Sequence, residues 1–354
     1  PLSSAIKEWK PDLLVLDEVH RIKANRGKAS RYIAELAKTI PAKLGLSGTP
    51  LSQGPLDIFG VYRALAPDIF PRTFTKFRER YTRPALMSEF YDSDIIIWAG
   101  RGGELTRAKF RNLDELETNM HLIADRVRAS DVLDLPSSSD QVIQAALEPG
   151  AKKIYREIQN DYISDLGGSS AIVTAANAMV VTLRLAQLTG GYLRDEDDQV
   201  HEVSTAKRDA LEDLLSDFRE PLVVFGRFHS DLDAINLACQ SAGLRASELS
   251  GRRNELEVWQ SGGTEVLIAQ VQAGSVGVDL TRSRAVVFYS LSYSLSEYLQ
   301  ARARVLRAGQ NRNVIFTHLI AGPVDTNIYR ALEARGSVVS AIVDLLFEEL
   351  ESKR

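Results

Sequence analysis

The sequence predicts an α/β protein built around parallel sheets. From Ser204 onward, short apolar runs alternate with helical patterns, which is typical of strand and helix units in a parallel sheet. Near the start of the chain, the apolar run 13–16 is followed by a second short strand at 43–46, with room for one helix between them. Strand, helix and strand form one crossover unit, so we expect these two strands to run parallel.

The first of these strands ends in charged side chains. Leu13-Leu14-Val15-Leu16 leads directly into Asp17 and Glu18, and His20 follows after one residue. In open parallel sheets, ligands bind just beyond the carboxyl ends of the strands. One carboxylate there can hold the Mg²⁺ that bridges nucleotide phosphates, while its neighbour orients or deprotonates an attacking water. Taken alone, an acidic helix cap after a buried strand explains the pair equally well.

The second predicted strand runs into Ser47-Gly48-Thr49-Pro50. The intervening segment 29–40 has apolar residues at the spacing of one helix face: Ile33, Leu36, Ala37 and Ile40. Hydroxyl groups at the end of the second strand can hydrogen-bond to the carboxylates that follow the first strand and sense a bound nucleotide. An ordinary Ser/Gly/Pro turn is the alternative interpretation.

A third motif occupies residues 300–310, Gln-Ala-Arg-Ala-Arg-Val-Leu-Arg-Ala-Gly-Gln. Arg304 and Arg307 are three residues apart, so on a helix they share one face. Two guanidinium groups on one face suit a phosphate whose charge builds up during phosphoryl transfer. A solvated basic helix face is the alternative.

Taken together and in this order, the motifs resemble the Swi/Snf-type branch of the superfamily-two helicases and DNA translocases. The matching motifs are Asp-Glu-X-His at 17–20, (Ser/Thr)-Gly-Thr-Pro at 47–50 and Gln-Ala-X-X-Arg-X-X-Arg-X-Gly-Gln at 300–310. Residues 273–280 resemble the family's fifth motif, although Ser275 and Asp279 replace a usual glycine and asparagine, and residues 222–231 resemble the fourth. The resemblance covers nearly the whole chain, and its details are closer to bacterial or phage helicases than to large chromatin remodellers.

The resemblance implies two RecA-like parallel-sheet domains, the first incomplete, with a mostly helical insertion between them. We place the first domain at residues 1–66, a Swi/Snf-type helical protrusion region at 67–203 and the second domain at 204–354. Predicted strands of the second domain are 222–225, 266–269, 285–289 and 314–319. Predicted helices are 151–166, 171–188, 206–218, 231–242, 255–260, 295–307, 325–335 and 338–350.

Roles for individual residues also follow from the resemblance. Asp17 would contact Mg²⁺ through water, Glu18 would position the hydrolytic water, and His20 would couple this site to the third motif. Residues that would contact ATP or link its state to domain movement are His20, Ser47, Thr49, Gly277, Asp279 and Gln300. Arg304 and Arg307 would close on the phosphates. Residues that would offer backbone amides to DNA phosphates are Ser250, Gly251, Ala273, Gly274 and Ser275.

One expected element is absent from the sequence. Enzymes of this type need a Gly-Lys-Thr or Gly-Lys-Ser loop, whose backbone amides and lysine hold the β and γ phosphates. The single Gly-Lys pair, Gly27-Lys28, is followed by Ala29 and lies after the acidic motif. Because the chain begins at Pro1, shortly before the acidic strand, we expect the front of the first domain to be missing, as in a fragment or half of a split gene.

Composition agrees with a cytoplasmic globular protein. The 354 residues are 44% hydrophobic and 25% charged, no apolar run approaches the length of a membrane span, and no signal peptide is visible. The single Cys239 excludes an intrachain disulfide. Net charge is −4 and the isoelectric point is about 5.9, so DNA would have to be bound through local basic patches such as 72–83 and 101–111.

The expected function is an ATP-dependent DNA helicase or translocase that uses ATP and Mg²⁺ and acts on double-stranded DNA. A helicase-like module that binds DNA or regulates a partner without hydrolysing ATP is the alternative. A nuclease subunit of a restriction system would share the motor, but its nuclease residues are not visible in the sequence. A Gly-Lys-Thr-type loop within roughly a hundred residues before Pro1 would favour the enzyme, because such a loop opens the same domain.

Overall fold

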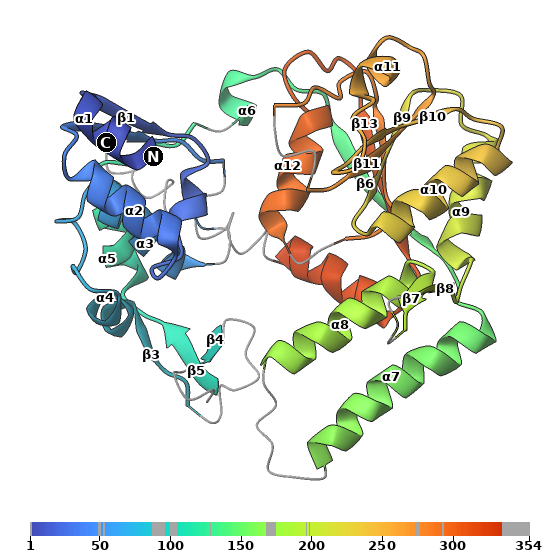
Figure 1. The fold of residues 1–354 in the computed structure, drawn as a ribbon, viewed down its shortest axis with the longest axis horizontal. Helices are drawn as coiled ribbons and strands as arrows, with labels where there is room; N and C mark the ends of the chain where they lie inside the picture. The colour runs from blue at the N-terminus through green and yellow to red at the C-terminus, as the bar shows by residue number, and fades with distance from the viewer. Residues whose placement is uncertain are drawn as a thin grey trace. The chain divides into compact units, whose positions relative to one another are not determined.

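The computed structural model describes residues 2–48, 51, 54–86, 96–99, 105–127, 129–167, 175–195, 197, 199–272, 277–291 and 294–334. The chain divides into two compact units, shown in Figure 1. Unit 1 comprises residues 1–126 together with 335–354, and unit 2 comprises residues 127–334. The predicted helix at 338–350 lies outside the described residues.

Unit 1 contains the predicted crossover. Strand β1 (Leu13–Leu16) pairs in parallel with β2 (Ala42–Gly45), and the short helix η1 (Val19–Ile22) and helix α2 (Lys28–Ala37) connect them. Helix α1 (Leu2–Trp9) precedes β1, while η2 (Pro55–Asp57) and α3 (Ile58–Leu65) follow β2. Leu14 and Leu16 pack against the core of unit 1. This arrangement fixes the carboxyl end of β1, where the acidic motif begins.

Aromatic residues fill the rest of this core. Rings of α3 and α4 (Phe74–Tyr81) meet edge to face or tilted, as with Phe59 and Phe77, whose centroids are 5.3 Å apart. Helix α5 (Leu113–Met120) adds buried Leu116 and Met120. Strands β3 (Thr82–Pro84), β5 (Leu105–Phe110) and β4 (Ile96–Ala99) form a small antiparallel sheet in that order. Gly60 is required where α3 crosses η1, because a Cβ there would lie 2.3 Å from the carbonyl oxygen of Ile22.

Unit 2 is built on a six-stranded parallel sheet with the strand order β10-β11-β9-β12-β13-β6. The strands are β6 (Ser138–Gln144), β9 (Leu222–Gly226), β10 (Ala246–Leu249), β11 (Val266–Gln270), β12 (Ala285–Phe288) and β13 (Val314–Ile320). Every neighbouring pair runs parallel. The predicted fold class, α/β with parallel sheets in two parts of the chain, is therefore confirmed.

Helices cover both faces of this sheet (Figure 1). Alternate residues of β9 point to opposite faces, since Leu222 and Val224 join one core with α9 (Ala206–Ser216) and α10 (His229–Ser241). On the other face, Phe288 of β12 lies 5.1 Å from Tyr298 of α12 (Leu295–Val305), measured between ring centroids. A short helix, α11 (Leu256–Gln260), follows β10, and residues 323–334 are also helical. Cys239 is buried in α10, and burial raises the pKa of its thiol to about 12.

The region 67–203 holds more strands than the sequence predicts. It contains helices α4 to α8, among them α6 (Ala129–Val132), α7 (Pro149–Gly167) and α8 (Ala175–Thr189), but also strands β3 to β8. Strand β6 pairs along its whole length with β13 and forms the edge of the large sheet, and β7 (Tyr192–Arg194) forms a hairpin with β8 (Val200–Glu202). The bounds of the three predicted domains stay predictions, since the division into two compact units does not test them.

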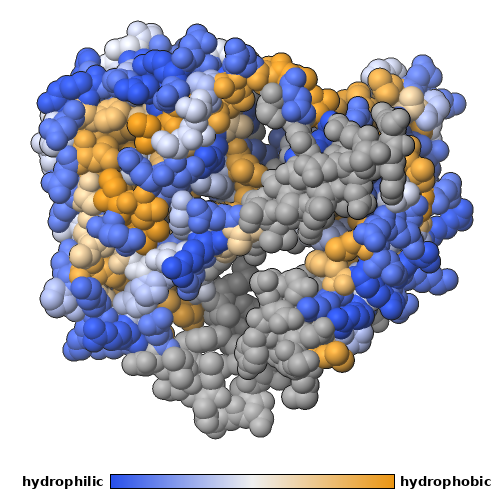
Figure 2. Space-filling model, turned by 180° about the vertical axis from the view of Figure 1, so that it is seen from behind, coloured by the Kyte–Doolittle hydropathy of each residue, from blue (hydrophilic) through white to orange (hydrophobic). Residues whose placement is uncertain are grey.

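Hydrophilic residues cover much of the surface in Figure 2, with hydrophobic residues gathered in patches between them. In the part of the chain that the structure describes, no helix combines the length and hydrophobicity needed to cross a membrane. One exposed apolar set lies on unit 1, where Leu13, Val15, Leu44 and Leu46 are 47–53% exposed. In β1 and β2 the register and the alternation of exposure place Leu13, Val15 and Leu44 on one face of the two-stranded sheet. Parallel sheets are normally covered on both faces.

Candidate functional site

The acidic motif forms a tight turn at the carboxyl end of β1. Glu18 has φ 49° and ψ 49°, the left-handed region that non-glycine residues rarely adopt, and this costs roughly 1–3 kcal/mol. The turn is held by Glu18 N, which donates to Asp17 Oδ1 at 2.8 Å, and by Val19 N, which donates to the Leu46 carbonyl at 2.9 Å. Asp17 is exposed and Glu18 is half-buried. The turn therefore presents both carboxylates at the edge of the sheet where ligands of parallel sheets bind.

His20 connects the acidic motif to the end of the second strand. Its Nδ1 lies 3.0 Å from Ser47 Oγ and 3.2 Å from Glu18 Oε2. His20 is only 9% exposed, and burial lowers the pKa of its imidazole below the usual value although the Glu18 carboxylate opposes this. At neutral pH the ring is therefore uncharged. The structure brings His20 and Ser47 together, as the resemblance implies, whereas Thr49 and Pro50 lie outside the described residues.

The donor set around Asp17 fits a water-mediated Mg²⁺. Oδ1 of Asp17 accepts the Glu18 amide, and the described residues give Oδ2 no partner. Among the described residues, no group of three or more His, Cys, Asp or Glu side chains could form a protein cage for a metal. Mg²⁺ in nucleotide enzymes is held by one or two carboxylates, phosphates and waters, so a single exposed carboxylate is sufficient on the protein side.

Unit 2 brings the predicted fifth and sixth motifs into contact. Leu280 N donates to the Arg304 carbonyl at 3.0 Å, and Arg307 Nη1 lies 3.4 Å from the Val278 carbonyl. Oδ1 of Asp279 accepts hydrogen bonds from the Thr281 amide at 2.9 Å and the Thr281 hydroxyl at 2.7 Å. These bonds lower the pKa of Asp279, and the positive charge of Arg307 lowers it further. The Asp279 carboxylate thus fixes its own turn and faces the Arg307 charge.

The prediction that Arg304 and Arg307 share one helix face is wrong. Helix α12 ends at Val305, and Leu306 leaves the helix with φ −91° and ψ 85°. Arg304 remains on the last turn of α12, whereas Arg307 lies in the turn beyond it. Gln300, one helical turn before Arg304, donates from Nε2 to Ser296 Oγ at 3.4 Å within the same helix.

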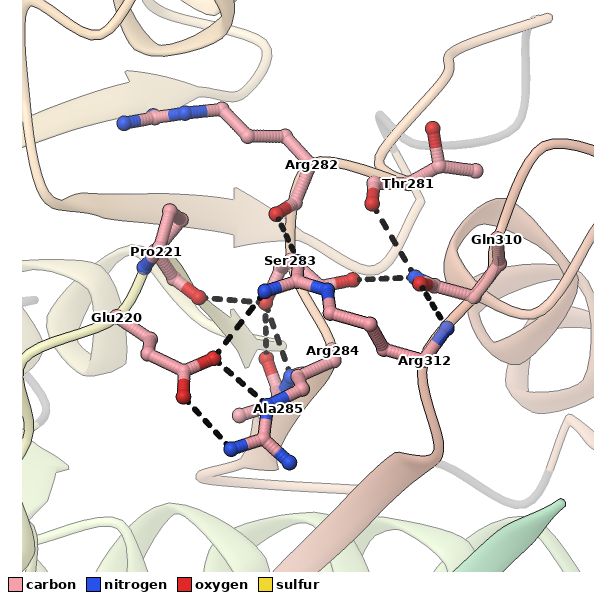
Figure 3. Close-up of polar contacts among 9 residues, drawn as sticks. All are labelled: Glu220, Pro221, Thr281, Arg282, Ser283, Arg284, Ala285, Gln310 and Arg312. Atoms are coloured by element: carbon pink, nitrogen blue, oxygen red, sulfur yellow. Dashed lines mark hydrogen bonds and ion pairs between the residues drawn. The ribbon is translucent and has the colours of Figure 1, made fainter. Parts of the chain in front are cut away.

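Gln310 explains why the helix stops there. It is only 3% exposed, and its Nε2 donates to the carbonyls of Ser283 at 2.8 Å and Thr281 at 3.2 Å, while its Oε1 accepts the Arg312 amide at 3.2 Å (Figure 3). A helix continued through this segment could not bring the amide side chain to those carbonyls. Arg312 and Arg284 share the Glu220 carboxylate at the base of the same cluster. Gln310 therefore ties the turn that carries Arg307 to the segment after Asp279.

The predicted DNA contacts are described only in part. Ser250 Oγ donates to Glu248 Oε1 at 2.5 Å and accepts the Arg252 amide at 3.1 Å, so the hydroxyl is already engaged within its own loop. Gly251 N donates weakly, at 3.4 Å, to Gln270 Oε1. Ala273, Gly274 and Ser275 lie outside the described residues. Of the basic stretch 72–83, Arg80 forms a two-pronged ion pair with Glu115 at 2.5 and 2.7 Å.

Two polar clusters of unit 2, one around the buried Asp231 and one around the half-buried Arg302, were not predicted. Asp231 is fully buried, and its Oδ2 accepts the amides of Arg227 at 3.1 Å and Phe228 at 2.9 Å and the Ser290 hydroxyl at 2.5 Å. Burial raises the pKa of this carboxyl. Arg302 makes a two-pronged ion pair with Asp140 of β6 and stacks on Phe316, with its guanidinium 3.9 Å from the ring centroid. For Arg302 the sequence offers no signal, because Asp140 and Phe316 come from distant segments, whereas Asp231 draws two of its partners from the four residues before it.

Comparisons with known proteins agree with the motif order. The model of the SNF2-related domain matches residues 2–191, and the model of the helicase conserved C-terminal domain matches residues 206–309. The chain is 22% identical to the chromodomain-helicase-DNA-binding protein 1-like of Danio rerio, over 89% of this chain and 30% of that protein. It is 22% identical to the ATP-dependent DNA helicase DDM1 of Arabidopsis thaliana (91% and 44%) and 23% identical to the DNA annealing helicase and endonuclease ZRANB3 of Bos taurus (99% and 32%).

Among solved structures, the Sulfolobus solfataricus SWI2/SNF2 ATPase core in complex with dsDNA aligns with a TM-score of 0.47 at 18% identity, over 94% of this chain and 68% of that one. The C-terminal part of the Fun30 ATPase domain aligns with a TM-score of 0.47 at 16% identity, over 62% and 99%. The chain spans less than half the length of the three curated relatives named above. Because the SNF2-related model alone matches more than half of its residues, the chain belongs to the SNF2-related family.

Proposed function

We propose that this chain is the motor portion of an ATP-dependent DNA translocase of the Swi/Snf type. The observation that carries the proposal is the contact between the two motifs of unit 1. Two carboxylates lie on a strained turn at the end of a parallel strand, and His20 contacts Ser47, which follows the neighbouring strand. Two of the relatives, an ATP-dependent DNA helicase and a DNA annealing helicase and endonuclease, support the same activity.

In this proposal the residues of unit 1 orient the attacking water and transmit the occupancy of the nucleotide site to the neighbouring strand. Asp17 would hold Mg²⁺, which would neutralise charge on the nucleotide phosphates, and Glu18 would position the attacking water and accept its proton. Neutral His20 exchanges its hydrogen bond between Glu18 and Ser47, 3.2 and 3.0 Å away, so that the occupancy of the site reaches the segment after β2. ATP bound with Mg²⁺ supplies the phosphoryl group that is transferred to water.

In unit 2, Arg304 and Arg307 stabilise the negative charge that develops on the transferred phosphate. Gln310 keeps Arg307 beside Asp279, so the arginine is positioned before the nucleotide arrives. Gly277, Asp279 and Gln300 line the nucleotide on this side. DNA phosphates are held by backbone amides near Ser250, Gly251 and 273–275, which makes binding independent of sequence. Each cycle of nucleotide-driven closure and opening moves the DNA by a small step.

The phosphate-binding loop has to come from sequence other than these 354 residues, since none of them forms a Gly-Lys-Thr or Gly-Lys-Ser motif. The exposed apolar face of β1 and β2 supports this, because Leu13, Val15, Leu44 and Leu46 would be covered by the remainder of a RecA-like domain. We use the term complete enzyme for this chain together with the segment that supplies the loop.

The proposal is tested by Glu18→Gln in the complete enzyme. We expect ATP to bind with nearly unchanged affinity and hydrolysis to fall by at least a hundredfold, because the water loses the base that orients it. Arg304→Ala and Arg307→Ala should also cripple hydrolysis. Glu257→Gln, at an exposed position of α11, is the matched control and should hydrolyse ATP normally. Near-normal turnover in Glu18→Gln would reject the assignment.

The alternative function is a helicase-like module that binds DNA without hydrolysing ATP, and the missing Gly-Lys-Thr or Gly-Lys-Ser loop favours it. Residues 1–354 alone should show no ATP turnover under either proposal. The two proposals differ for the complete enzyme: duplex DNA stimulates its ATP hydrolysis if it is a translocase, and it binds DNA without turnover if it is a module.

A further inference from the structure

A cavity of about 620 Å³ lies in unit 1, away from the acidic motif. Its walls come from α2 between Arg31 and Ala37, from Lys38, from β2, from α3 and from the segment 66–72. Helix α2 returns the chain from the carboxyl end of β1 to the amino end of β2, so its last turns and Lys43 lie at the amino-terminal edge of the sheet. None of the residues 17–20 lines the cavity. It is therefore a separate site from the proposed nucleotide site.

The lining of this cavity is strongly basic. Two acidic side chains, Glu35 and Asp68, and five basic side chains line it, a local excess of three positive charges in a chain whose net charge is −4. The five basic residues are Arg31, Lys38, Lys43, Arg63 and Arg72. Such a concentration of one sign in a concave surface raises the local concentration of anions.

Both acidic side chains are already paired at the rim. Glu35 accepts from Lys38 Nζ at 2.6 Å, and Asp68 accepts from Arg72 Nη2 at 2.9 Å. Both pairs are largely solvated, so they add little to the stability of the fold, but within each pair the carboxylate neutralises its cation. Among the described residues, no ion pair involves the remaining three cations, Arg31, Lys43 and Arg63. These three side chains supply the unbalanced positive charge.

Arg63 is held in place by neutral groups. Its Nη1 donates to the Asn25 carbonyl at 3.0 Å, its Nη2 donates to Ser30 Oγ at 2.8 Å, and its guanidinium lies 5.5 Å from the centroid of Phe59. Burial lowers the pKa of Arg63, and the nearby positive charge of Arg31 lowers it further, while the negative charge of Glu35 opposes both effects. An anion placed between these two guanidinium groups would relieve their mutual repulsion.

The inner wall of the cavity is aromatic and rigid. Phe59, Tyr62 and Phe70 are each less than 7% exposed, and the rings of Tyr62 and Phe70 meet edge to face at 5.0 Å. The Tyr62 hydroxyl donates to the Met120 carbonyl, so its ring is fixed. An aromatic wall beside a cationic rim suits a ligand with an anionic head and a flat apolar body. The volume falls in the range of about 300–1,000 Å³ that is typical of small-molecule sites.

We propose that this cavity binds a small organic phosphate of mononucleotide size. The phosphate group lies among Arg31, Lys43 and Arg63, where guanidinium groups match phosphate oxygens. The ring system lies against Phe59, Tyr62 and Phe70. A mononucleotide fills a cavity of this size, whereas a nucleic-acid strand needs an open groove with repeated phosphate contacts. The site is independent of the proposed ATPase function.

The test is calorimetric titration of the chain with AMP in the presence of a metal chelator. We expect saturable binding, which Arg31→Gln/Lys43→Gln weakens at least tenfold. Arg31 is exposed and Lys43 is half-buried, and glutamine retains most of the length of both side chains, so we expect the double variant to fold, which circular dichroism verifies. Lys28→Gln, an exposed residue at the start of the same helix that does not line the cavity, is the matched control and should bind AMP with unchanged affinity.

Three results would overturn the proposal. One is the absence of AMP binding at millimolar concentration. Another is AMP binding that the double variant leaves unchanged or that Glu18→Gln abolishes, which would place AMP elsewhere. The third is tight binding of a short single-stranded oligonucleotide that depends on Arg31 and Lys43 and that AMP does not displace, which would make the surface a strand contact.

Discussion

Replacing Lys207 with methionine removes one half of an ion pair that unit 2 buries almost completely. Lys207 Nζ lies 2.9 Å from Asp325 Oδ2, and the two side chains are 1% and 7% exposed. Lys207 also donates to the Tyr289 carbonyl at 3.0 Å, which ties α9 to the end of β12. Asp325 accepts the Ala321 amide at 2.9 Å and the Thr189 hydroxyl at 3.0 Å. The pair thus joins α9, β12, α8 and the helix 323–334.

The expected loss follows from the burial. Removing one partner of a buried ion pair costs roughly 3–5 kcal/mol, because an uncompensated charge remains in a medium of low polarity. Methionine has nearly the length of lysine, so little cavity is added, and the two hydrogen bonds to Asp325 stabilise the carboxylate that remains. We therefore expect about 3 kcal/mol. With a urea dependence of about 2 to 3 kcal/mol per molar, the unfolding midpoint should fall by about 1 to 1.5 M.

Trp259 provides the assay. It is fully buried in unit 2, so its fluorescence reports the unfolding of that unit once Trp9 and Trp98 of unit 1 are replaced by phenylalanine in every protein compared. Lys153→Met is the matched control, because Lys153 and Glu157 are 79% and 56% exposed and 3.8 Å apart, and it should cost less than about 0.5 kcal/mol.

A second variant separates charge from packing. Lys207→Met/Asp325→Asn removes both charges of the pair. The asparagine oxygen still accepts the Ala321 amide, and the Thr189 hydroxyl can accept from the new amide NH₂, so the double variant should be more stable than Lys207→Met alone. The reasoning is refuted if Lys207→Met costs no more than Lys153→Met, or if the double variant is the less stable of the two.

Three further predictions concern stability. Gln310→Ala should cost about 1–3 kcal/mol, because the buried carbonyls of Ser283 and Thr281 lose their donor, and urea unfolding at Trp259 measures this; an unchanged midpoint would contradict it. Gly60→Ala should lower the melting temperature of unit 1 by several degrees, since its Cβ would lie 2.3 Å from the Ile22 carbonyl oxygen and 2.5 Å from that of Lys23. Gly150→Ala, in unit 2, meets no neighbour and should leave the melting temperature of its own unit unchanged. Burial lowers the pKa of His318 to about 4. Below about pH 6.5 the unfolded chain therefore binds a proton at this histidine and the folded chain does not. The free energy of unfolding should fall by about 3 kcal/mol between pH 6.5 and 4. His318→Phe should flatten that dependence, and an identical pH profile in both proteins would count against it.

Much of unit 2 was predictable because its strands are nearly continuous apolar runs. The runs at 222–225 and 266–269 became β9 and β11, with buried side chains on both faces, as expected for a parallel sheet. The acidic motif was predictable for a related reason: an apolar run that ends abruptly in charge marks the edge of a sheet. The contact between His20 and Ser47 follows from the register of two parallel strands.

The features that could not be predicted depend on contacts between distant residues. Strand β6 is polar and largely exposed, so no apolar pattern marks it, and it forms because β13 offers an unpaired edge. The early end of α12 depends on where Gln310 finds its carbonyl partners. The ion pairs between Asp140 and Arg302 and between Lys207 and Asp325 each join residues that are more than a hundred positions apart in the sequence. Local periodicity carries no information about such partners.

The most direct test of the proposed function is displacement of the third strand from a DNA triplex by the complete enzyme, because it reports movement along duplex DNA and not ATP turnover alone. We predict that ATP and Mg²⁺ drive displacement, that Glu18→Gln and Arg307→Ala abolish it, and that Glu257→Gln leaves it unchanged. Displacement by Glu18→Gln at the rate of the unmodified enzyme, or ATP hydrolysis by the unmodified enzyme without any displacement, would contradict the proposal that this chain is a DNA translocase.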